Sequence, residues 1–222
     1  MFLEVSDVLS PTEVERLCVL AAGARFVEGR LSNPHSQVKN NLQVDHADSA
    51  YAESSRLMAQ ALHRSEAFRD FAFPRTLAPP LLAKYTPGMN YGVHSDSAVI
   101  AAGYAPLRSD LSCTLFIADP ATYEGGELSL QLGGRTITFK GPAGSAVVYP
   151  STTLHEVRPV TSGERLVGLT FIESVIREAA KREILASLNE VAALEGFNMS
   201  WENRTRLQHA RDNLLRLWRE AV

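Results

Sequence analysis

The residues of this chain best suited to chemistry are two histidines and one aspartate. His94 and Asp96 form an H-x-D triplet, and His155 follows much later in the chain. On an extended strand successive side chains alternate between faces, so His94 and Asp96 should project from one face, about 7 Å apart at the backbone. Two imidazoles and one carboxylate on one side of an ion suit non-haem Fe(II) and leave coordination positions open. Oxygen chemistry requires such open positions.

An H-x-D triplet is weakly specific by itself, and the chain contains a second one at His46 and Asp48. The residues around His46 are polar and lack the apolar alternation of a strand, which indicates a loop and the start of a helix. The first triplet instead follows a Pro-Gly turn and a short strand. We therefore predict that His94, Asp96 and His155 bind the metal, and a surface His-Asp pair is the alternative.

The segment of the chain that contains His155 also contains two arginines. Strand alternation indicates which of the two faces the same side as His155. A hairpin turn is predicted at Thr161-Ser162-Gly163, before a strand that begins at Arg165. If His155 faces the metal, Arg158 falls on the opposite face, whereas Arg165 is in phase with an apolar set suited to a barrel interior. This set comprises Val167, Leu169 and Phe171. A guanidinium there matches a carboxylate with two parallel hydrogen bonds. A salt bridge to a nearby Asp or Glu is the alternative.

Composition and charge indicate one globular domain with an appendage. The 222 residues can bury one sizeable core. A formal net charge of −3 gives no basic excess, so we expect no nucleic acid as the main partner. The first residues lack the features of a secretory signal, and no stretch of about 20 apolar residues occurs, so we expect a cytoplasmic protein that contacts no membrane. Cys18 and Cys113 lie among apolar residues and indicate small core residues in a reducing compartment.

The middle of the chain predicts a mainly β structure of the sandwich or jelly-roll type. Strand signals recur at short intervals between Leu77 and Ile172, with glycine turns and no helical pattern between them. Gly133-Gly134 is predicted as a two-residue hairpin turn, because glycine accepts a positive φ. The expected strands include Ala24–Leu31, Leu111–Ala118, Glu127–Leu132, Arg135–Phe139 and Ser145–Tyr149.

Helices are predicted to flank the strands on the N-terminal side. Ser10-Pro11-Thr12-Glu13 is a capping box with proline at the first helical position, which predicts a helix to about Ala22. A second helix fits Ser49–His63, where apolar residues recur at helical spacing.

The composition changes after Ser174, where helical periodicity begins. Two helices are expected at Val175–Leu194 and Arg204–Ala221, and they should pack together. We therefore predict a jelly-roll domain with N-terminal helices at residues 1–174 and a C-terminal helical extension at 175–222. The extension contains Trp201, His209 and Trp218, which we interpret as packing or dimer-surface residues, so a homodimer through these helices is a further expectation.

The chain resembles the PKHD-type hydroxylases, a bacterial branch of the prolyl 4-hydroxylase-like 2-oxoglutarate and Fe(II)-dependent dioxygenases. The resemblance extends over nearly the whole chain and rests on residues 39–43, 85–96, 108–112, 124–128, 155–165 and 171–174. It implies a double-stranded β-helix, a cupin-like jelly roll. It also implies that His94, Asp96 and His155 ligate iron and that Arg165 binds the distal carboxylate of 2-oxoglutarate.

The resemblance has further implications for the co-substrate. Tyr85 occupies the place of a tyrosine that contacts 2-oxoglutarate in related prolyl hydroxylases. Some relatives have another tyrosine where this chain has Ile117, so a second contact stays open. The implied reaction consumes O2 and 2-oxoglutarate, hydroxylates a C–H bond and releases succinate and CO2, with L-ascorbate (vitamin C) to rescue oxidised iron. Asp96 favours hydroxylation, because a halogenase leaves that ligand position to chloride.

The substrate is not identified by any residue. A small metabolite, a siderophore-like molecule and a peptide side chain all fit the resemblance. Ser97–Ser109 is a candidate lid beside the iron. Lys39, Asn40 and Asn41 could face the pocket, although a polar strand face is the alternative. A non-catalytic jelly roll that senses iron or 2-oxoglutarate is the second functional hypothesis.

Overall fold

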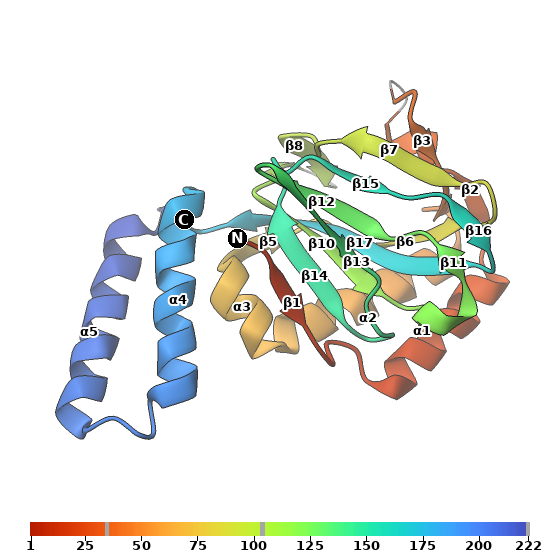
Figure 1. The fold of residues 1–222 in the computed structure, drawn as a ribbon. Coiled ribbons are helices and arrows are strands. Elements are labelled where there is room, and N and C mark those ends of the chain that lie inside the picture. The colour runs from red at the N-terminus through yellow and green to blue at the C-terminus, as the bar shows by residue number, and fades with distance from the viewer. Residues whose placement is uncertain (34–35, 103–104, 221–222) are drawn as a thin grey trace.

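Two antiparallel sheets lie face to face and form the predicted jelly roll (Figure 1). The structure is a computed structural model that describes residues 1–33, 36–102 and 105–220. The larger sheet contains β1 (Leu3–Val5), β2 (Phe26–Glu28), β4 (Leu42–Val44), β5 (Pro74–Leu77), β6 (Leu81–Tyr85), β10 (Leu111–Phe116), β14 (Ala146–Pro150) and β17 (Arg165–Ser174). The smaller sheet contains β3 (Lys39–Asn40), β7 (Asn90–His94), β12 (Leu128–Leu132), β13 (Arg135–Phe139) and β15 (His155–Val157).

The order of the strands brings residues that are distant in sequence together. The larger sheet runs β1-β14-β10-β17-β6-β4-β2, with β5 also paired to β17, and the smaller runs β13-β12-β15-β7-β3. Two short pairs complete the strands of the described residues. They are β8 (Val99–Ala102) with β9 (Ala105–Arg108), and β11 (Glu124–Gly125) with β16 (Val160–Ser162).

Three helices cover the outer face of the larger sheet (Figure 1). They are α1 (Pro11–Gly23), α2 (Ser49–Arg64) and α3 (Glu66–Ala72). The capping box at Ser10 and Glu13 is present, and the helix predicted after it is confirmed. Asp48 is the N-cap of α2 and accepts a hydrogen bond from the backbone of Ala50. The aspartate of the second H-x-D triplet therefore has a structural role.

Strand alternation divides the apolar residues between two cores. Side chains on the outer face of the larger sheet, such as Leu82 and Leu115, pack against α1, α2 and α3. Those on the inner face, such as Ala83 and Val147, pack against residues of the smaller sheet. Cys113 is buried in the outer core, as predicted, but Cys18 is exposed. That prediction was wrong because α1 turns Leu17 and Ala21 to the sheet, and the neighbouring Cys18 lies on another side of the helix.

Three local predictions differ from the structure. The strand expected at Ala24–Leu31 is confined to Phe26–Glu28, because a 3₁₀ turn, η1 (Gly29–Ser32), follows it. The helix α3 was not predicted. The hairpin predicted around residues 161–163 is absent, because the strands before and after the turn do not pair with each other. β16 pairs with β11, whereas β17 belongs to the larger sheet. Gly163, with φ of 71°, therefore lies where the chain passes from one sheet to another. The Gly133-Gly134 hairpin turn is present, with Leu132 opposite Arg135.

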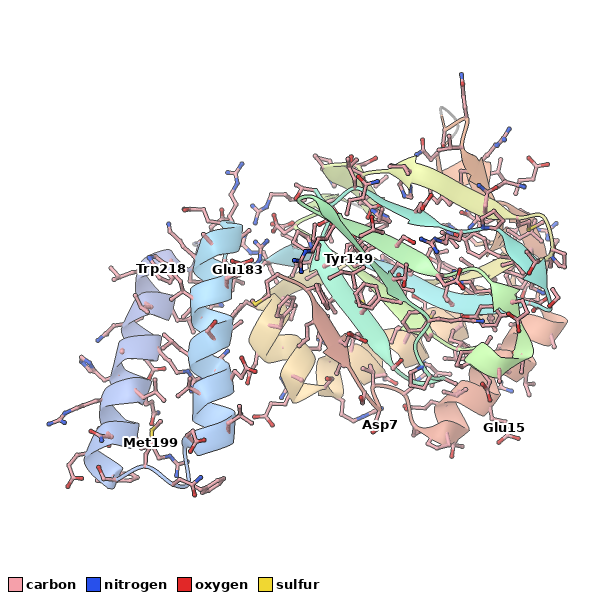
Figure 2. The ribbon with its side chains drawn as sticks, viewed as in Figure 1. Asp7, Glu15, Tyr149, Glu183, Met199 and Trp218 are labelled. Atoms are coloured by element: carbon pink, nitrogen blue, oxygen red, sulfur yellow. The ribbon has the colours of Figure 1, made fainter. Side chains whose placement is uncertain are left out.

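The C-terminal residues form the predicted helical pair, which stands beside the sheets (Figure 1). It consists of α4 (Ala179–Glu195) and α5 (Trp201–Trp218). A second short 3₁₀ turn, η2 (Pro120–Thr122), lies far earlier in the chain, between β10 and β11. Asn189 of α4 donates a hydrogen bond to the backbone of Asp70 in α3. Figure 2 labels Trp218 on α5, and Lys181 Nζ of α4 lies 5.9 Å from the centre of its ring. No helix of the described residues is both long and apolar enough to cross a membrane.

The chain then returns from α5 to the end of the larger sheet. The backbone N–H of Glu220 donates to Val175, and its carboxylate lies 3.0 Å from Arg108 Nη1. Arg108 is the last residue of β9 and also contacts Asp110 at 2.9 Å. The extension is thus attached to the root of the β8–β9 hairpin as well as to α3.

Candidate active site

His94, Asp96 and His155 come together on the wall of one cavity. In the pairing of β7 with β15, His94 lies directly opposite His155, so the two imidazoles are cross-strand neighbours. Asp96 follows the end of β7, and its backbone N–H donates to Ser151. Asp96 Oδ1 lies 3.8 Å from His94 Nε2, and Oδ2 lies 3.6 Å from His155 Nε2. The three side chains can therefore each offer one ligand atom to a shared metal ion.

Both imidazoles are oriented in the same way by the backbone. His94 Nδ1 lies 2.8 Å from the carbonyl of Gly92, and His155 Nδ1 lies 2.9 Å from that of Thr153. A carbonyl only accepts, so each Nδ1 must bear a proton, which leaves Nε2 as the ring nitrogen that can bind a metal. Burial, and then the neighbouring His155, lower the pKa of His94 to about 4. The His94 imidazole is thus neutral at physiological pH, as metal binding requires.

The alternative of a surface His-Asp pair does not fit this arrangement. The His94 and Asp96 side chains are only 14% and 13% exposed. The Tyr91 ring stacks on His94 with 3.5 Å between centroids, and the Tyr149 ring meets His155 edge-on. Figure 2 shows Tyr149 between the two sheets. Aromatic rings therefore limit the movement of both imidazoles before any metal binds.

Arg165 and Tyr85 form a second cross-strand pair, in the larger sheet. They lie opposite each other in the pairing of β17 with β6, and the guanidinium carbon is 4.9 Å from the centre of the Tyr85 ring. Arg165 is 1% exposed, and its Nε and Nη1 have no hydrogen-bond partner among the described residues. The alternative of a salt bridge is thus not realised there. Arg158 is exposed, as the strand phase predicts.

A buried guanidinium with unsatisfied donors can bind an anion in the cavity, because an unpaired buried charge is costly. The Tyr85 hydroxyl can assist, since burial raises its pKa to about 12 and keeps it a hydrogen-bond donor. Tyr123 also lies within hydrogen-bond reach of Arg165. It is a residue that the sequence analysis did not identify. The position of Ile117 offers no further contact, because its side chain is buried in the outer core.

One cavity of about 740 Å³ includes both the histidine-aspartate cluster and Arg165. Lys39, Asn41 and Gln43 line one wall at strand spacing, whereas Asn40 points away and donates to Gly88. Burial lowers the pKa of Lys39 to about 8. Gln43 was not predicted to face the cavity, and its side-chain oxygen is buried without a partner among the described residues.

Another part of the cavity lining is apolar and belongs to the candidate lid. Residues 97–109 contain the β8–β9 hairpin, whose Val99, Ile100 and Ala101 line the cavity. Gly103, part of the predicted lid, lies outside the described residues. His46 of the second triplet also lines this cavity, stacked on Tyr51 with 4.3 Å between centroids. It is not part of the cluster around Asp96.

Gly126 is predicted to be needed for the position of Arg165. Its φ of 68° is left-handed, and a Cβ there would lie 2.9 Å from Arg165 Cδ. We expect Gly126→Ala to lower the free energy of unfolding by about 1–2 kcal/mol and to weaken 2-oxoglutarate binding, because the added methyl group displaces the guanidinium. Denaturant unfolding and 2-oxoglutarate titration measure the two effects. Gly134→Ala is the control, since a Cβ there meets nothing within 4 Å. Equal behaviour of the two variants would contradict the prediction.

Comparison with known proteins identifies the chain as a 2-oxoglutarate and Fe(II)-dependent oxygenase. Residues 80–173 match the model of the 2OG-Fe(II) oxygenase superfamily. The crystal structure of a Pseudomonas putida prolyl-4-hydroxylase aligns with a TM-score of 0.56 and 20% identity, over 78% of this chain and 92% of that one. A Trichoplax adhaerens prolyl hydroxylase in complex with a hypoxia inducible factor peptide fragment aligns with a TM-score of 0.55 and 15% identity, over 84% and 86%. These structures show the jelly-roll fold.

The chain belongs to the PKHD-type hydroxylases. It is 51% identical over 213 residues to the PKHD-type hydroxylase of Sphingopyxis alaskensis, a match that covers 96% of this chain and 97% of that protein. The enzyme class and the family that the sequence analysis expected are thereby confirmed.

Proposed function

We propose that the chain hydroxylates a small metabolite or siderophore-like molecule, or a peptide side chain, with release of succinate and CO2. The observation that supports this proposal most strongly is the meeting, in one cavity, of two imidazoles, a carboxylate and a buried arginine whose Nε and Nη1 have no partner in the part of the chain that the structure describes. In this proposal His94, Asp96 and His155 hold Fe(II). Arg165 and Tyr85 bind the distal carboxylate of the co-substrate.

The residues present fit the implied groups. Fe(II) and 2-oxoglutarate, when bound, supply the oxidising chemistry, and the protein supplies ligation, orientation and exclusion of water. The Arg165 fork and the Tyr85 hydroxyl can offer several hydrogen bonds to one carboxylate, which fixes the direction of the co-substrate. The aromatic rings of Tyr91 and Tyr149 shield the two imidazoles from solvent. L-ascorbate is part of the proposal through the family alone.

The size of the cavity supports a substrate bound beside the co-substrate. A volume of about 740 Å³ lies within the range that holds a drug-sized ligand. The lining combines the polar Lys39 and Gln43 with apolar residues of the hairpin, which suits a substrate that has both polar and apolar groups. The peptide complex of the Trichoplax relative makes a peptide side chain a reasonable alternative to a small molecule.

Two further parts of the proposal concern the whole molecule. Both cysteines are free, which supports a cytoplasmic location. Exposed apolar side chains on the helical pair, among them Leu194 at 70% and Trp201 at 75%, support a homodimer through α4 and α5. We also propose that residues 1–174 and residues 175–222 form two structural units, the jelly-roll domain and the helical extension.

The decisive test of the function is succinate formation by the purified chain under aerobic conditions with Fe(II) and 2-oxoglutarate. The alternative of a non-catalytic sensor predicts binding of both without succinate, and membership of a hydroxylase family does not favour it. A screen of cell extracts for products that gain the mass of a single oxygen atom would then identify the substrate. If no succinate formed with or without extract, the proposed function would be wrong.

A further inference from the structure

Three buried serine hydroxyls form a row that ends at the carboxylate of Asp96. Ser112 Oγ lies 2.5 Å from Asp96 Oδ2, Ser151 Oγ lies 2.8 Å from Ser112 Oγ, and Ser109 Oγ lies 2.7 Å from Ser151 Oγ. The three serines are 3%, 2% and 7% exposed, respectively. They come from β10, from the turn after β14 and from the residue after β9. Three separate segments thus converge on one side of the metal cluster.

The carboxylate fixes the direction of these hydrogen bonds. An ionised aspartate only accepts, so Ser112 must donate its single hydroxyl proton to Asp96. Ser112 therefore accepts from Ser151, and Ser151 accepts from Ser109. Hydrogen bonds that run in one direction polarise one another, which strengthens the bond at the end of the row. A hydroxyl has a single proton, so once Ser112 donates it to Oδ2, Ser112 can only accept from Ser151.

We propose that Ser112 is a positioning residue that reserves Oδ2 of Asp96 for hydrogen bonding and leaves Oδ1 as the only oxygen that binds the metal. This inference rests on the proposed role of Asp96 as a ligand. Carboxylates can bind a metal through one oxygen or through both. With both histidines bound, a bidentate Asp96 would occupy a position that the co-substrate or O2 needs. Ser112 thereby keeps the site open.

The surroundings of Asp96 support a positioning role. Its backbone N–H donates to the carbonyl of Ser151 at 3.2 Å, and the backbone N–H of Ser151 donates to Asp110 at 3.2 Å. Asp110 is itself held by Arg108. The backbone of Asp96 is therefore fixed independently of Ser112. Loss of the Ser112 hydroxyl should release the carboxylate to rotate without displacing the chain that bears it.

The test is an anaerobic titration of metal-free protein with Co(II). The ligand-field absorption bands of bound Co(II) report its coordination number. Their growth with Co(II) concentration gives the dissociation constant. We expect Ser112→Ala to weaken Co(II) binding by about 10- to 100-fold, the usual effect of removing an outer-sphere partner. Its bands should change toward a higher coordination number. The Co(II)-loaded variant should also bind 2-oxoglutarate more weakly, because a second Asp96 oxygen competes for the position.

Three further variants separate positioning from packing. Ser112→Thr retains a hydroxyl and should restore the Co(II) spectrum and both affinities. Ser129→Ala removes another buried serine, whose Oγ has no partner among the described residues, and should match the parent. Ser151→Ala removes the donor to Ser112 and the acceptor of Ser109 but leaves the Ser112 hydroxyl in place, so it should cause a smaller spectral change of the same kind. It serves as the test if Ser112→Ala does not fold.

The possible results distinguish this inference from the proposed function. A parent protein that binds no Co(II) would remove the metal site and the inference with it. A parent that binds Co(II), together with a Ser112→Ala variant of unchanged spectrum and affinities, would overturn the inference alone. A Ser112→Thr variant as impaired as Ser112→Ala, with the same melting curve, would also overturn it, because the hydroxyl would then not be the group that acts.

Discussion

Replacing His155 or His94 with alanine is expected to abolish the binding of a single Fe(II) per chain and, with it, aerobic succinate formation. Each substitution removes one of the three proposed protein ligands, and water replaces a lost imidazole poorly. The fold should persist with a free energy of unfolding lowered by about 0.5–3 kcal/mol, because His94 stacks on Tyr91 and His155 is buried. Metal analysis after anaerobic loading, beside a melting curve, measures both quantities.

His46→Ala is the matched control, since it removes the histidine of the second H-x-D triplet. His46 lines the same cavity but lies outside the ligand cluster, and Asp48 is occupied as the N-cap of α2. Iron content and succinate formation without added substrate should therefore stay near the parent values. If His46→Ala lost iron while His94→Ala kept it, the assignments of His155, Arg165 and Tyr85 would all have to be abandoned.

Replacing Arg165 with lysine is expected to raise the dissociation constant of 2-oxoglutarate by about 10- to 100-fold. Lysine keeps the charge but loses the bidentate fork, and a hydrogen bond to a charged group contributes roughly 1.5–3 kcal/mol. Since about 1.4 kcal/mol corresponds to a factor of ten, the loss of one such bond accounts for the expected range. Titration of the metal-loaded protein with 2-oxoglutarate under anaerobic conditions measures the constant directly.

Arg158→Lys provides the comparison from the same segment of chain. Arg158 is exposed and Arg165 is 1% exposed, so only the second can meet a ligand inside the sheets. Arg158→Lys should bind 2-oxoglutarate like the parent. If 2-oxoglutarate affinity fell more in Arg158→Lys than in Arg165→Lys, the inward and outward faces of the two strands would have been assigned the wrong way round.

The side chains of a strand that face the interior could be predicted from the sequence. Side chains alternate with a period of two, so only two assignments of inner and outer face exist. Once His155 is placed inside, Arg158 and Arg165 separate without any knowledge of strand order. The expectation that Lys39, Asn40 and Asn41 could all face the cavity did not use this rule and was wrong for Asn40, because the structure distributes these residues in alternation, with Asn40 outside and Asn41 inside. Local geometry alone is sufficient for such assignments.

Contacts between strands could not be predicted, because they depend on register. Nothing in the sequence indicates that Ser112 meets Asp96, since this contact requires β10 to lie beside β14 and β17 at one particular offset. The same limit explains the error at residues 161–163, where a turn signal is correct but the partner strands belong to different sheets. Cys18 shows the corresponding limit for helices, because a one-residue change rotates a side chain from the core to solvent.

The contact of Glu220 with Arg108 has a consequence for how the molecule is assembled. A chain emerges from the ribosome N-terminus first, and Glu220 follows every strand of both sheets. The sheets and the β8–β9 hairpin can therefore form while Asp110 and Glu173 are the acidic neighbours that Arg108 has among the described residues before Glu220. The nascent protein would pass through a stage in which both sheets are complete but the β8–β9 hairpin lacks the ion pair between Arg108 and Glu220. Translation that stalls within the helical pair would leave the molecule at that stage.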